Sequence, residues 1–291
     1  MFNPIPKVAA IHDLSGFGRS SLTVVIPILS NMGVQVCPLP TAVLSTHCEY
    51  QDYKFVDLTD HMKGFIDHWK KLNINFNSIY SGFLGSKEQI EIVKNFISDF
   101  SNDNTFVTVD PVLGDDGKLY GPFSEDMIGE MRSLIKSADI ITPNITEAAL
   151  LLNRKYKNNF SEKEIKQWLL DLSGYGPKIV IITSVPDNAV NSKTTSVVAY
   201  SREDNRFWKV SCDYLPAKFP GTGDAFTSVI VGALLQGDSL PIALDRAVQF
   251  VSIGIRATFG YKYDTNEGFL LERVLGSLSS NVQRSSYELL S

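Results

Sequence analysis

The stretch Phe219-Pro220-Gly221-Thr222-Gly223-Asp224-Ala225-Phe226 places two glycines and a small hydroxyl residue directly before a predicted helix at about 223–236. Glycines let backbone N–H groups approach an anion closely, and a helix N-terminus adds positive partial charge and unpaired donors. Residues 221–223 are therefore predicted to form an anion hole. Asp224 falls in the first helical turn, where its carboxylate can act as a general base toward an attacking alcohol. Taken alone, the stretch also suits an ordinary helix start, because Asp caps helices and Gly forms turns.

Short apolar runs alternate with helical patterns in the part of the chain before this turn. Strands are predicted at 7–12, 34–39, 78–81, 105–109, 139–142 and 178–183, and helices at about 20–32, 58–72, 87–100, 124–136 and 161–173. This alternation predicts an α/β fold with a mostly parallel central sheet and helices on both faces. A hairpin at 195–200 and 206–211 and helices at about 240–258 and 268–290 complete the predicted elements. Because no linker or internal repeat interrupts the pattern, residues 1–291 are predicted to form a single domain.

The composition argues against several classes of protein. With 44% hydrophobic, 20% charged and 11% aromatic residues, the chain has the balance of a globular protein. A formal charge of -5 argues against a nucleic-acid partner, because phosphate backbones are bound through clustered Lys and Arg. No apolar run reaches the roughly 20 residues that span a bilayer, and residues 1–4 lack the layout of a signal peptide. We therefore expect no membrane association and a cytoplasmic location.

The cysteines and histidines do not form a recognisable ligand pattern. Three cysteines at wide spacing fit neither a disulfide framework nor a zinc site. Of the four histidines, His61 and His68 share a predicted helix face, where a solvated pair is expected. We expect no structural metal.

Acidic residues follow two of the predicted strands. Asp110-Pro111-Val112-Leu113-Gly114-Asp115 comes after the strand at 105–109, and Thr142-Pro143-Asn144-Ile145-Thr146-Glu147 ends the next strand and opens a helix. Ligands of open α/β sheets bind beyond the carboxyl ends of the strands. Carboxylates at this edge suit Mg²⁺, which keeps several waters and bridges to nucleotide phosphates through one or two acidic groups. Each segment alone also suits a turn or a capping box, but together with 221–224 they favour a phosphoryl-transfer site.

On these motifs the chain resembles the ribokinase superfamily, whose Gly-x-Gly-Asp turn opens a helix in the C-terminal third. Asp-Pro-Val-Leu-Gly-Asp at 110–115 and Ala-Asp-Ile-Ile-Thr-Pro-Asn at 138–144 are similar to the pyridoxal kinase branch. Residues 80–85, Tyr-Ser-Gly-Phe-Leu-Gly, are similar to its Ser/Thr-Gly-Tyr-Leu-Gly turn, with Phe83 in place of Tyr. The matches run from residue 12 to residue 226. The resemblance implies a ribokinase-like three-layer sandwich and ATP-dependent phosphorylation of the 5'-hydroxyl of pyridoxal or a close B6 vitamer.

The resemblance also implies roles for individual residues. The anion hole would be formed by Gly221, Thr222 and Gly223, and Asp224 would deprotonate the substrate hydroxyl. Mg²⁺ and the phosphates of ATP would be organised by Asp110, Asp115 and Glu147. The nucleotide would lie near Asp115, Asn144, Thr183 and Phe219, with Tyr120 covering its phosphates. A monovalent cation such as K⁺ is a further candidate cofactor, and a homodimer is expected because homodimers are common among these kinases.

The acceptor pocket is predicted at the same edge of the sheet. A flat heteroaromatic acceptor needs apolar or aromatic walls and a few polar groups that orient it. The candidate residues are Ser15, His47, Tyr50, Tyr80 and Phe83. In pyridoxal kinases a Ser and an Asn-His-Thr-x-Tyr-like segment line the pocket, which carries over to Ser15, His47 and Tyr50. Thr46 and Cys48 replace the Asn and the Thr of that segment, so the preferred vitamer is left open, and His47 alone also suits a packed or capping histidine.

Three other functions fit parts of the sequence. A hydroxymethylpyrimidine (phosphate) kinase of thiamine synthesis shares the fold and resembles residues 13–18, but such enzymes usually have Cys where this chain has Asp224. A sugar kinase would need a pocket richer in Asn, Asp and Gly for binding hydroxyls. A non-catalytic B6-binding protein that has kept the fold is the alternative from another class.

Overall fold

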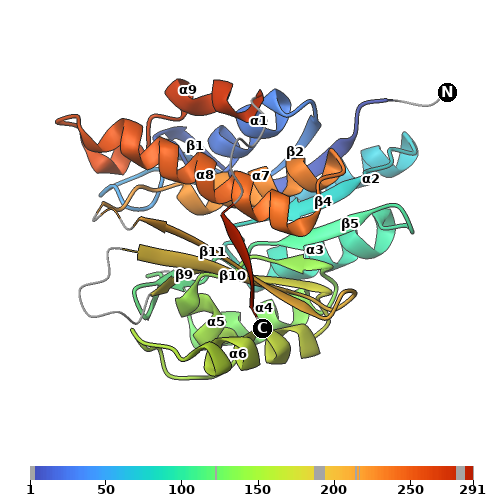
Figure 1. Ribbon diagram of the computed structural model, residues 1–291. Coiled ribbons are helices and arrows are strands. Elements are labelled where there is room, and N and C mark those ends of the chain that lie inside the picture. Colours follow the sequence, from blue (N-terminus) through green and yellow to red (C-terminus); the bar gives the residue numbers. More distant parts are fainter. Residues whose placement is uncertain are drawn as a thin grey trace.

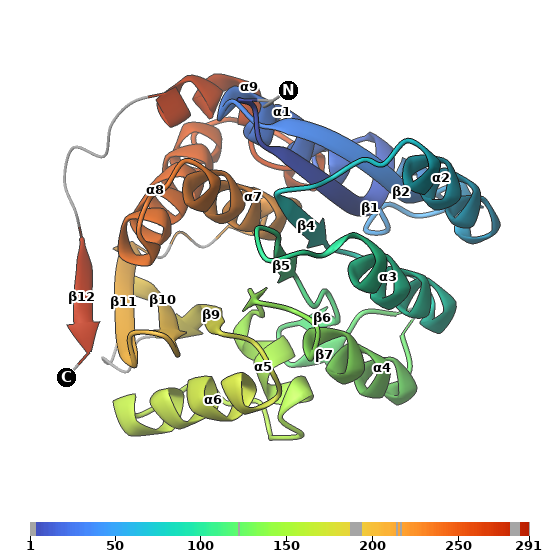
Figure 2. The same cartoon turned by 90° about the vertical axis from the view of Figure 1, so that its right-hand side faces the viewer.

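A mixed sheet of ten strands, counted over the described residues, runs through the centre of the molecule in the order β12-β11-β10-β9-β8-β5-β4-β1-β2-β3 (Figures 1 and 2). The structure is a computed structural model that describes residues 4–121, 123–186, 194–213, 215, 217–279 and 286–290. The parallel strands are β1 (Lys7–Phe17), β2 (Gln35–Thr46), β4 (Ser78–Ser81), β5 (Phe106–Val109), β8 (Ile140–Ile141) and β9 (Ile179–Pro186). Antiparallel strands extend both edges, namely β3 (Phe55–Asp57) at one and β10 (Thr194–Ser201), β11 (Arg206–Asp213) and β12 (Tyr287–Leu290) at the other.

Helices cover both faces of this sheet (Figure 2). One face carries α1 (Leu22–Asn31), α7 (Thr222–Leu235), α8 (Leu240–Phe259) and the short α9 (Leu271–Val274). The other carries α2 (Thr59–Lys71), α3 (Lys87–Phe100), α4 (Glu125–Ile135), α5 (Ile145–Leu151) and α6 (Glu162–Gly174). The predicted three-layer α/β architecture with a mostly parallel sheet is confirmed.

The residues of β1 show why the strand is buried on both sides. Val8 and Ala10 pack toward α1 and α7, whereas Ala9 and Ile11 pack toward the helices of the opposite face. All four side chains are fully buried, as expected for a central parallel strand whose successive side chains alternate between the two faces. The strand was predicted to end at residue 12, but it continues to Phe17, which pairs with Thr46 of β2. The Gly-rich segment at 13–18 therefore begins as part of the sheet.

The helix predicted at 268–290 is wrong. The chain instead forms two short 3₁₀ segments, Thr265–Glu267 and Leu275–Ser279, with α9 between them, and ends in β12. Gly268 adopts φ +82°, which interrupts any helix there. Residues 287–290 form an antiparallel pair with β11, in which Leu290 pairs with Phe207. Residues 280–285 lie outside the described part of the chain. The helical pattern in this part of the sequence does not decide the structure, because the free edge of β11 accepts residues 287–290 as one more strand.

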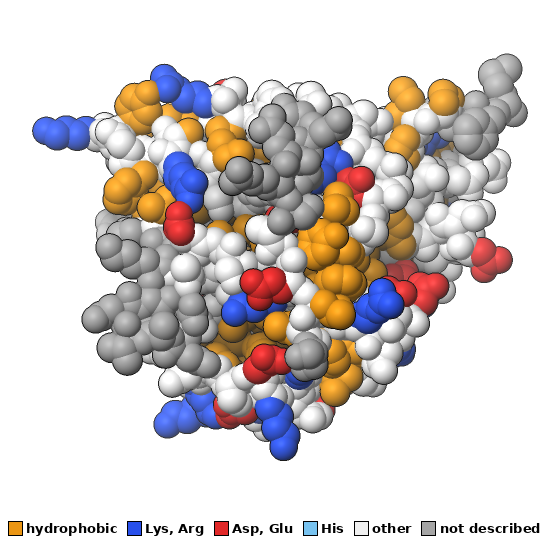
Figure 3. Space-filling model, viewed as in Figure 1, with side chains coloured by type: hydrophobic (Ala, Val, Ile, Leu, Met, Phe, Trp, Pro, Cys, Tyr) orange, Lys and Arg blue, Asp and Glu red, His pale blue; other side chains and the backbone are white. Residues whose placement is uncertain are grey.

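The surface mixes charges of both signs. On the face drawn in Figure 3, basic and acidic side chains lie interspersed among apolar and uncharged ones. Among the described residues, no helix combines the length and apolar character that crossing a membrane requires.

Candidate active site

The turn before α7 is shaped by a close backbone approach. Gly221 is the N-cap residue of α7 and has a left-handed conformation, φ +79°. A Cβ at this position would lie 2.2 Å from the carbonyl oxygen of Arg19, so glycine is required. The Gly221 carbonyl accepts the first helical hydrogen bond, from the Ala225 amide at 2.9 Å. The amides that follow Gly221 are those that a helix leaves without an intrahelical partner, which makes the turn a suitable anion site.

Asp224 lies in the first turn of α7, and its side chain is 14% exposed. Its Oδ2 accepts a hydrogen bond from the backbone N–H of Ser21 at 2.8 Å, and its Oδ1 lies 3.9 Å from Nδ1 of His12. Burial raises the pKa of Asp224 to about 6, with a smaller contribution from the charge of Asp13 and an opposing one from the Ser21 amide. A carboxyl group with this pKa is mostly ionised at neutral pH and remains basic enough to accept a proton.

Asp110 lies at the end of β5, beside the same turn. A Cβ at Gly223 would be 3.9 Å from its Oδ2, and the Thr227 hydroxyl of α7 lies 3.5 Å from the same oxygen. The Thr227 hydroxyl also donates to Oγ1 of Thr142, at 2.9 Å, which links the ends of β5 and β8 to α7. Burial and then the charge of Asp224 raise the pKa of Asp110 to about 8. A bound divalent cation favours the ionised carboxylate and reverses this effect.

Glu147 holds the segment after β5 against α5. Its Oε1 accepts the Leu113 amide at 3.1 Å, and its Oε2 accepts the Asn144 amide at 2.8 Å. Asn144 completes a capping box, since its Oδ1 accepts the Glu147 amide at 2.9 Å, and its Nδ2 donates to the Gly114 carbonyl at 2.8 Å. Burial, followed by the charge of Asp110, raises the pKa of Glu147. The capping box accounts for both residues structurally, and their roles toward metal and nucleotide stay predictions.

A short hairpin of β6 (Gly114–Asp115) and β7 (Lys118–Leu119) lies beside α5. Its two turn residues, 116 and 117, have φ values of 51° and 76°, and such paired positive values favour an Asp-Gly turn. Oδ2 of Asp115 lies 2.9 Å from Nζ of Lys218, which stands three residues before Gly221. This ion pair connects the hairpin to the segment that leads into the anion turn.

The loop between β1 and α1 is organised around Asp13, a residue for which no role was predicted. Oδ1 of Asp13 accepts the Ser21 hydroxyl at 2.5 Å, and Oδ2 accepts the Ser15 hydroxyl at 3.4 Å. The Ser20 hydroxyl donates in turn to Oγ of Ser15, at 3.2 Å. Burial raises the pKa of Asp13, although these hydroxyl groups oppose the rise. The signal in the sequence was an aspartate followed by three serines within eight residues.

His47 joins two segments that are far apart in the sequence. Its Nε2 lies 2.5 Å from the carbonyl oxygen of Asn266. Its ring is 4.9 Å from that of Tyr50, and the ring of Tyr50 is 6.0 Å from that of Phe17, between ring centroids. Phe17 is 51% exposed and supplies an aromatic surface that the sequence analysis missed. The geometry favours the interpretation of His47 as a packed histidine. Tyr50 and Phe17 offer apolar surface beside it.

The remaining pocket residues differ in exposure. Phe83 is partly exposed and stacks on Phe123, with ring centroids 5.4 Å apart, and Cys48 is exposed. Tyr80 is fully buried and meets His12 edge-on, so it lies beneath the site and does not form an open wall.

The predicted nucleotide residues also lie in different surroundings. Thr183 forms a parallel bridge with Asn144, and its amide donates to the Pro143 carbonyl at 2.9 Å. Tyr120 is half-buried, and burial raises the pKa of its hydroxyl. Phe219 is buried in a core cluster with residues of α7 and α8, so the nucleotide contact predicted for it would require a rearrangement.

A family model described as phosphomethylpyrimidine kinase matches residues 12–268. The chain belongs to this family. A Bacteroides thetaiotaomicron protein provisionally named a phosphomethylpyrimidine kinase, solved in a crystal form with pyridoxal, is 58% identical, with a TM-score of 0.95 over 98% of this chain and 100% of its own. The pyridoxal kinase of Lactobacillus plantarum is 29% identical, with a TM-score of 0.84 over 94% of this chain and 96% of its own. The pyridoxal kinase of Dictyostelium discoideum is 25% identical over 98% of this chain and 92% of its own.

These similarities confirm the predicted resemblance to pyridoxal kinases and the fold that it implied. They extend over almost the whole chain, beyond residues 12–226, which contain the matching motifs. The phosphomethylpyrimidine kinase family is also the family of the main rival function.

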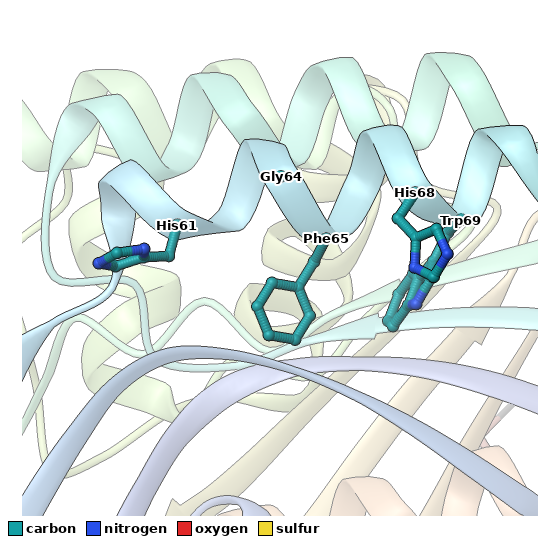
Figure 4. A pocket seen from close by; sticks show the side chains of 5 residues that line it. All are labelled: His61, Gly64, Phe65, His68 and Trp69. Carbon is teal, nitrogen blue, oxygen red and sulfur yellow. The ribbon is translucent and has the colours of Figure 1, made fainter.

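Two surface hollows lie on other elements. One is lined by His61, Gly64, Phe65, His68 and Trp69 of α2, and Figure 4 shows the four side chains pointing from that helix to the same side. The other lies beside α6 and is lined by Arg154, Lys155, Lys157, Glu164, Gln167 and Trp168. Neither includes a residue of the candidate active site described above. His61 and His68 share a helix face, as predicted, and both are exposed.

Proposed function

We propose that this protein transfers the γ-phosphoryl group of ATP to the 5'-hydroxyl of pyridoxal or a close B6 vitamer. The observation that carries the proposal is the position of Asp224, in the first turn of α7 and directly after the 221–223 turn. A 58% identical relative solved with pyridoxal supports a B6 vitamer as the acceptor. Relatives named pyridoxal kinase support the same acceptor and the reaction type.

In this reaction Asp224 accepts the proton of the acceptor hydroxyl while the hydroxyl oxygen attacks the γ-phosphorus. The bond from that phosphorus to the β-phosphate oxygen breaks, and ADP leaves with the bonding electrons. The backbone amides at the start of α7 would bind the transferred group, where the helix dipole favours negative charge. Phosphoryl transfer depends mainly on positioning and on stabilisation of charge, and both are provided at this turn.

Mg²⁺ fits the donors at the ends of β5 and β8. In the described part of the chain, no three His, Cys, Asp or Glu residues form a ligand set of their own. Mg²⁺ is commonly held by one or two carboxylates, with water and phosphate oxygens as the other ligands. We assign Asp110 as the carboxylate that would hold it, because both oxygens of Glu147 accept backbone amides and Asp115 is paired with Lys218. When bound, the cation would neutralise charge on the phosphates.

A monovalent cation such as K⁺ stays a candidate cofactor. Replacing K⁺ by a bulky organic cation in the assay tests this requirement directly.

The acceptor would lie between the loop after β1 and the loop after β2. Tyr50, Phe17 and Phe83 supply partly exposed aromatic surface for a flat ring. Cys48 is the exposed polar candidate for orienting it, whereas Ser15 is fully buried and donates to Asp13. Thr46 and Cys48 are the two positions at which this chain departs from the pyridoxal kinase segment. Cys48 is exposed as a residue, although burial of its thiol raises the pKa of that group.

We further propose that the chain is a single-domain, cytoplasmic enzyme that forms a homodimer. The outer strand β3 leaves apolar side chains exposed at the sheet edge, with Phe55 46% and Val56 56% exposed and Val43 of β2 paired opposite Val56. Exposed apolar surface of this kind suits a protein interface. The three free cysteines suit a reducing compartment.

Hydroxymethylpyrimidine (phosphate) kinase activity is the second candidate, and it is favoured by the family to which the chain belongs. Asp224 argues against it, because the resembling enzymes of thiamine synthesis usually carry Cys at this position. The deciding experiment measures ADP release with pyridoxal, pyridoxine, pyridoxamine and hydroxymethylpyrimidine side by side. We expect the highest kcat/KM with a B6 vitamer, and a clear preference for the pyrimidine would overturn the proposal.

A further inference from the structure

His12 occupies an unusual position at the end of β1. Its side chain is fully buried, and the strand register shifts between His12 and Leu14. Neither ring nitrogen has a hydrogen-bond partner among the described residues. A buried polar atom without a partner costs about 1–3 kcal/mol, so native proteins rarely keep one without a functional reason.

The imidazole ring is held in one place by its surroundings. Tyr80 meets it edge-on, with ring centroids 4.4 Å apart and an interplanar angle of 80°. On another side lies Gly82, where a Cβ would come within 2.3 Å of Nδ1 and 2.5 Å of Cε1. The Gly82 amide donates to the Ile11 carbonyl at 3.1 Å, which fixes the end of β4 beside β1. The ring therefore has little freedom to move away from its present contacts.

The carboxylate of Asp224 faces His12 across 3.9 Å, measured from Nδ1 to Oδ1, which is longer than a hydrogen bond. Burial lowers the pKa of His12 to about 3, so the imidazole is neutral and the contact is not an ion pair. A neutral imidazole carries one N–H, and placing it on Nδ1 directs that donor toward the carboxylate. Oδ2 of Asp224 already accepts the Ser21 amide, so a contact at Oδ1 would fix the second oxygen.

We propose that His12, as the neutral tautomer with its proton on Nδ1, is a positioning residue that holds the Asp224 carboxylate in the orientation needed to accept the substrate proton. The proposal rests on the function proposed above and adds a residue to it. With the Ser21 amide as its only partner, the carboxylate can rotate about its Cβ–Cγ bond. With the N–H dipole of His12 facing the other oxygen across 3.9 Å, a second, electrostatic interaction restrains this rotation. Because the imidazole is uncharged, it orients the carboxylate without the loss of basicity that a neighbouring cation would cause.

Three substitutions separate positioning from simple packing. In His12→Asn the side-chain amide reaches the place of Nδ1, in His12→Gln it reaches the place of Nε2, and His12→Leu removes all polar atoms. We expect His12→Leu and His12→Gln to lower kcat about 10- to 100-fold, because misplacing a catalytic group has effects of this size. The KM values for pyridoxal and ATP should stay within about threefold, since His12 is buried beneath the site. His12→Asn should recover most of the lost kcat.

Wild-type kcat in folded His12→Leu, or equal losses in all three variants, would overturn the proposal. A measurement on the unmodified enzyme covers the case in which the variants do not fold. Nitrogen-15 NMR of the histidine ring should show the Nδ1–H tautomer for His12 at neutral pH, and the Nε2–H tautomer or a charged ring would contradict the proposal. If the wild-type enzyme phosphorylates no B6 vitamer, the proposed function fails, whereas the tautomer of His12 is decided independently of activity.

Discussion

Asp224 and Asp110 are neighbouring carboxyl groups, the first 14% exposed and the second buried, and the pKa values of both are raised. Asp224 has a pKa of about 6 and Asp110 of about 8, and each is raised mainly by burial. Asp110 has the higher pKa of the two, so its ionisation depends more strongly on a bound cation. Pairs of titratable groups whose pKa values are pushed apart often mark acid–base assignments. The difference agrees with a base role for Asp224, which rests on its place in the first turn of α7, and a cation role for Asp110 at the end of β5.

The pKa of Asp224 predicts how activity depends on pH. The base must be ionised, so kcat/KM for pyridoxal should rise with pH through a midpoint near 6 and level off above it. The residual activity of Asp224→Asn should lack this rise, and the same variant serves as the control for titration of the substrates. Steady-state rates measured between pH 5 and pH 8 at saturating Mg²⁺ would check this. A wild-type profile with the same shape as that of Asp224→Asn would contradict it.

The residues that could be predicted from the sequence are those that lie within a local pattern. Asp224 follows a Gly-rich turn, and Asp110 follows an apolar strand, so a short window identifies each of them. His12 and Ser21 were missed because they acquire their roles by meeting Asp224, about two hundred positions away along the chain. His47 was found, but its contact with Asn266 was not, since it depends on a loop more than two hundred residues later.

At the scale of elements, the two ends of α7 provide a matched pair of glycines. Gly221 at its start and Gly237 after its end both have positive φ, +79° and +89°. A Cβ at 221 would meet the Arg19 carbonyl at 2.2 Å, whereas a Cβ at 237 would meet nothing within 4 Å. Both alanine substitutions should therefore lower stability through backbone strain, by about 1–2 kcal/mol. Gly221→Ala should also lose activity by more than about tenfold, because the clash distorts the anion turn.

Urea unfolding and ADP release, measured on both variants, would check this expectation. Gly237→Ala should lose stability but keep its turnover. Equal activity in the two variants would show that the 221 turn does not bind the transferred group.

The elements that sequence patterns predicted correctly are those with strong local signals. The strands at 78–81 and 105–109 and the helix at 87–100 match β4, β5 and α3 within one residue. The error at 268–290 arose where pairing with a distant strand determines the structure. Tyr287 packs edge-on against Trp208, with ring centroids 5.7 Å apart, and no window around residue 287 contains that partner.

At the scale of the whole molecule, we expect one edge of the sheet, at β3, and not the other, at β12, to form the homodimer interface. The β3 edge exposes Val56 by 56%, and the β12 edge exposes Leu289 by 57%, so the two side chains form a matched pair. We expect Val56→Glu to shift the proposed homodimer toward monomer, because a charge in an apolar interface is costly to desolvate. Leu289→Glu should leave the dimer intact. Sedimentation velocity of both variants checks this, and dissociation by Leu289→Glu alone would place the interface at the other edge.

The central claim is that Asp224 removes the proton from the acceptor hydroxyl while the turn at 221–223 binds the transferred phosphoryl group. The most direct test compares ADP release by the wild-type enzyme and by Asp224→Asn at saturating pyridoxal, with pyridoxal binding measured separately by calorimetry. Loss of a general base typically lowers the rate by about 10²- to 10⁴-fold, and we expect a fall in this range with pyridoxal affinity retained. Turnover of Asp224→Asn equal to that of the wild type would contradict the account.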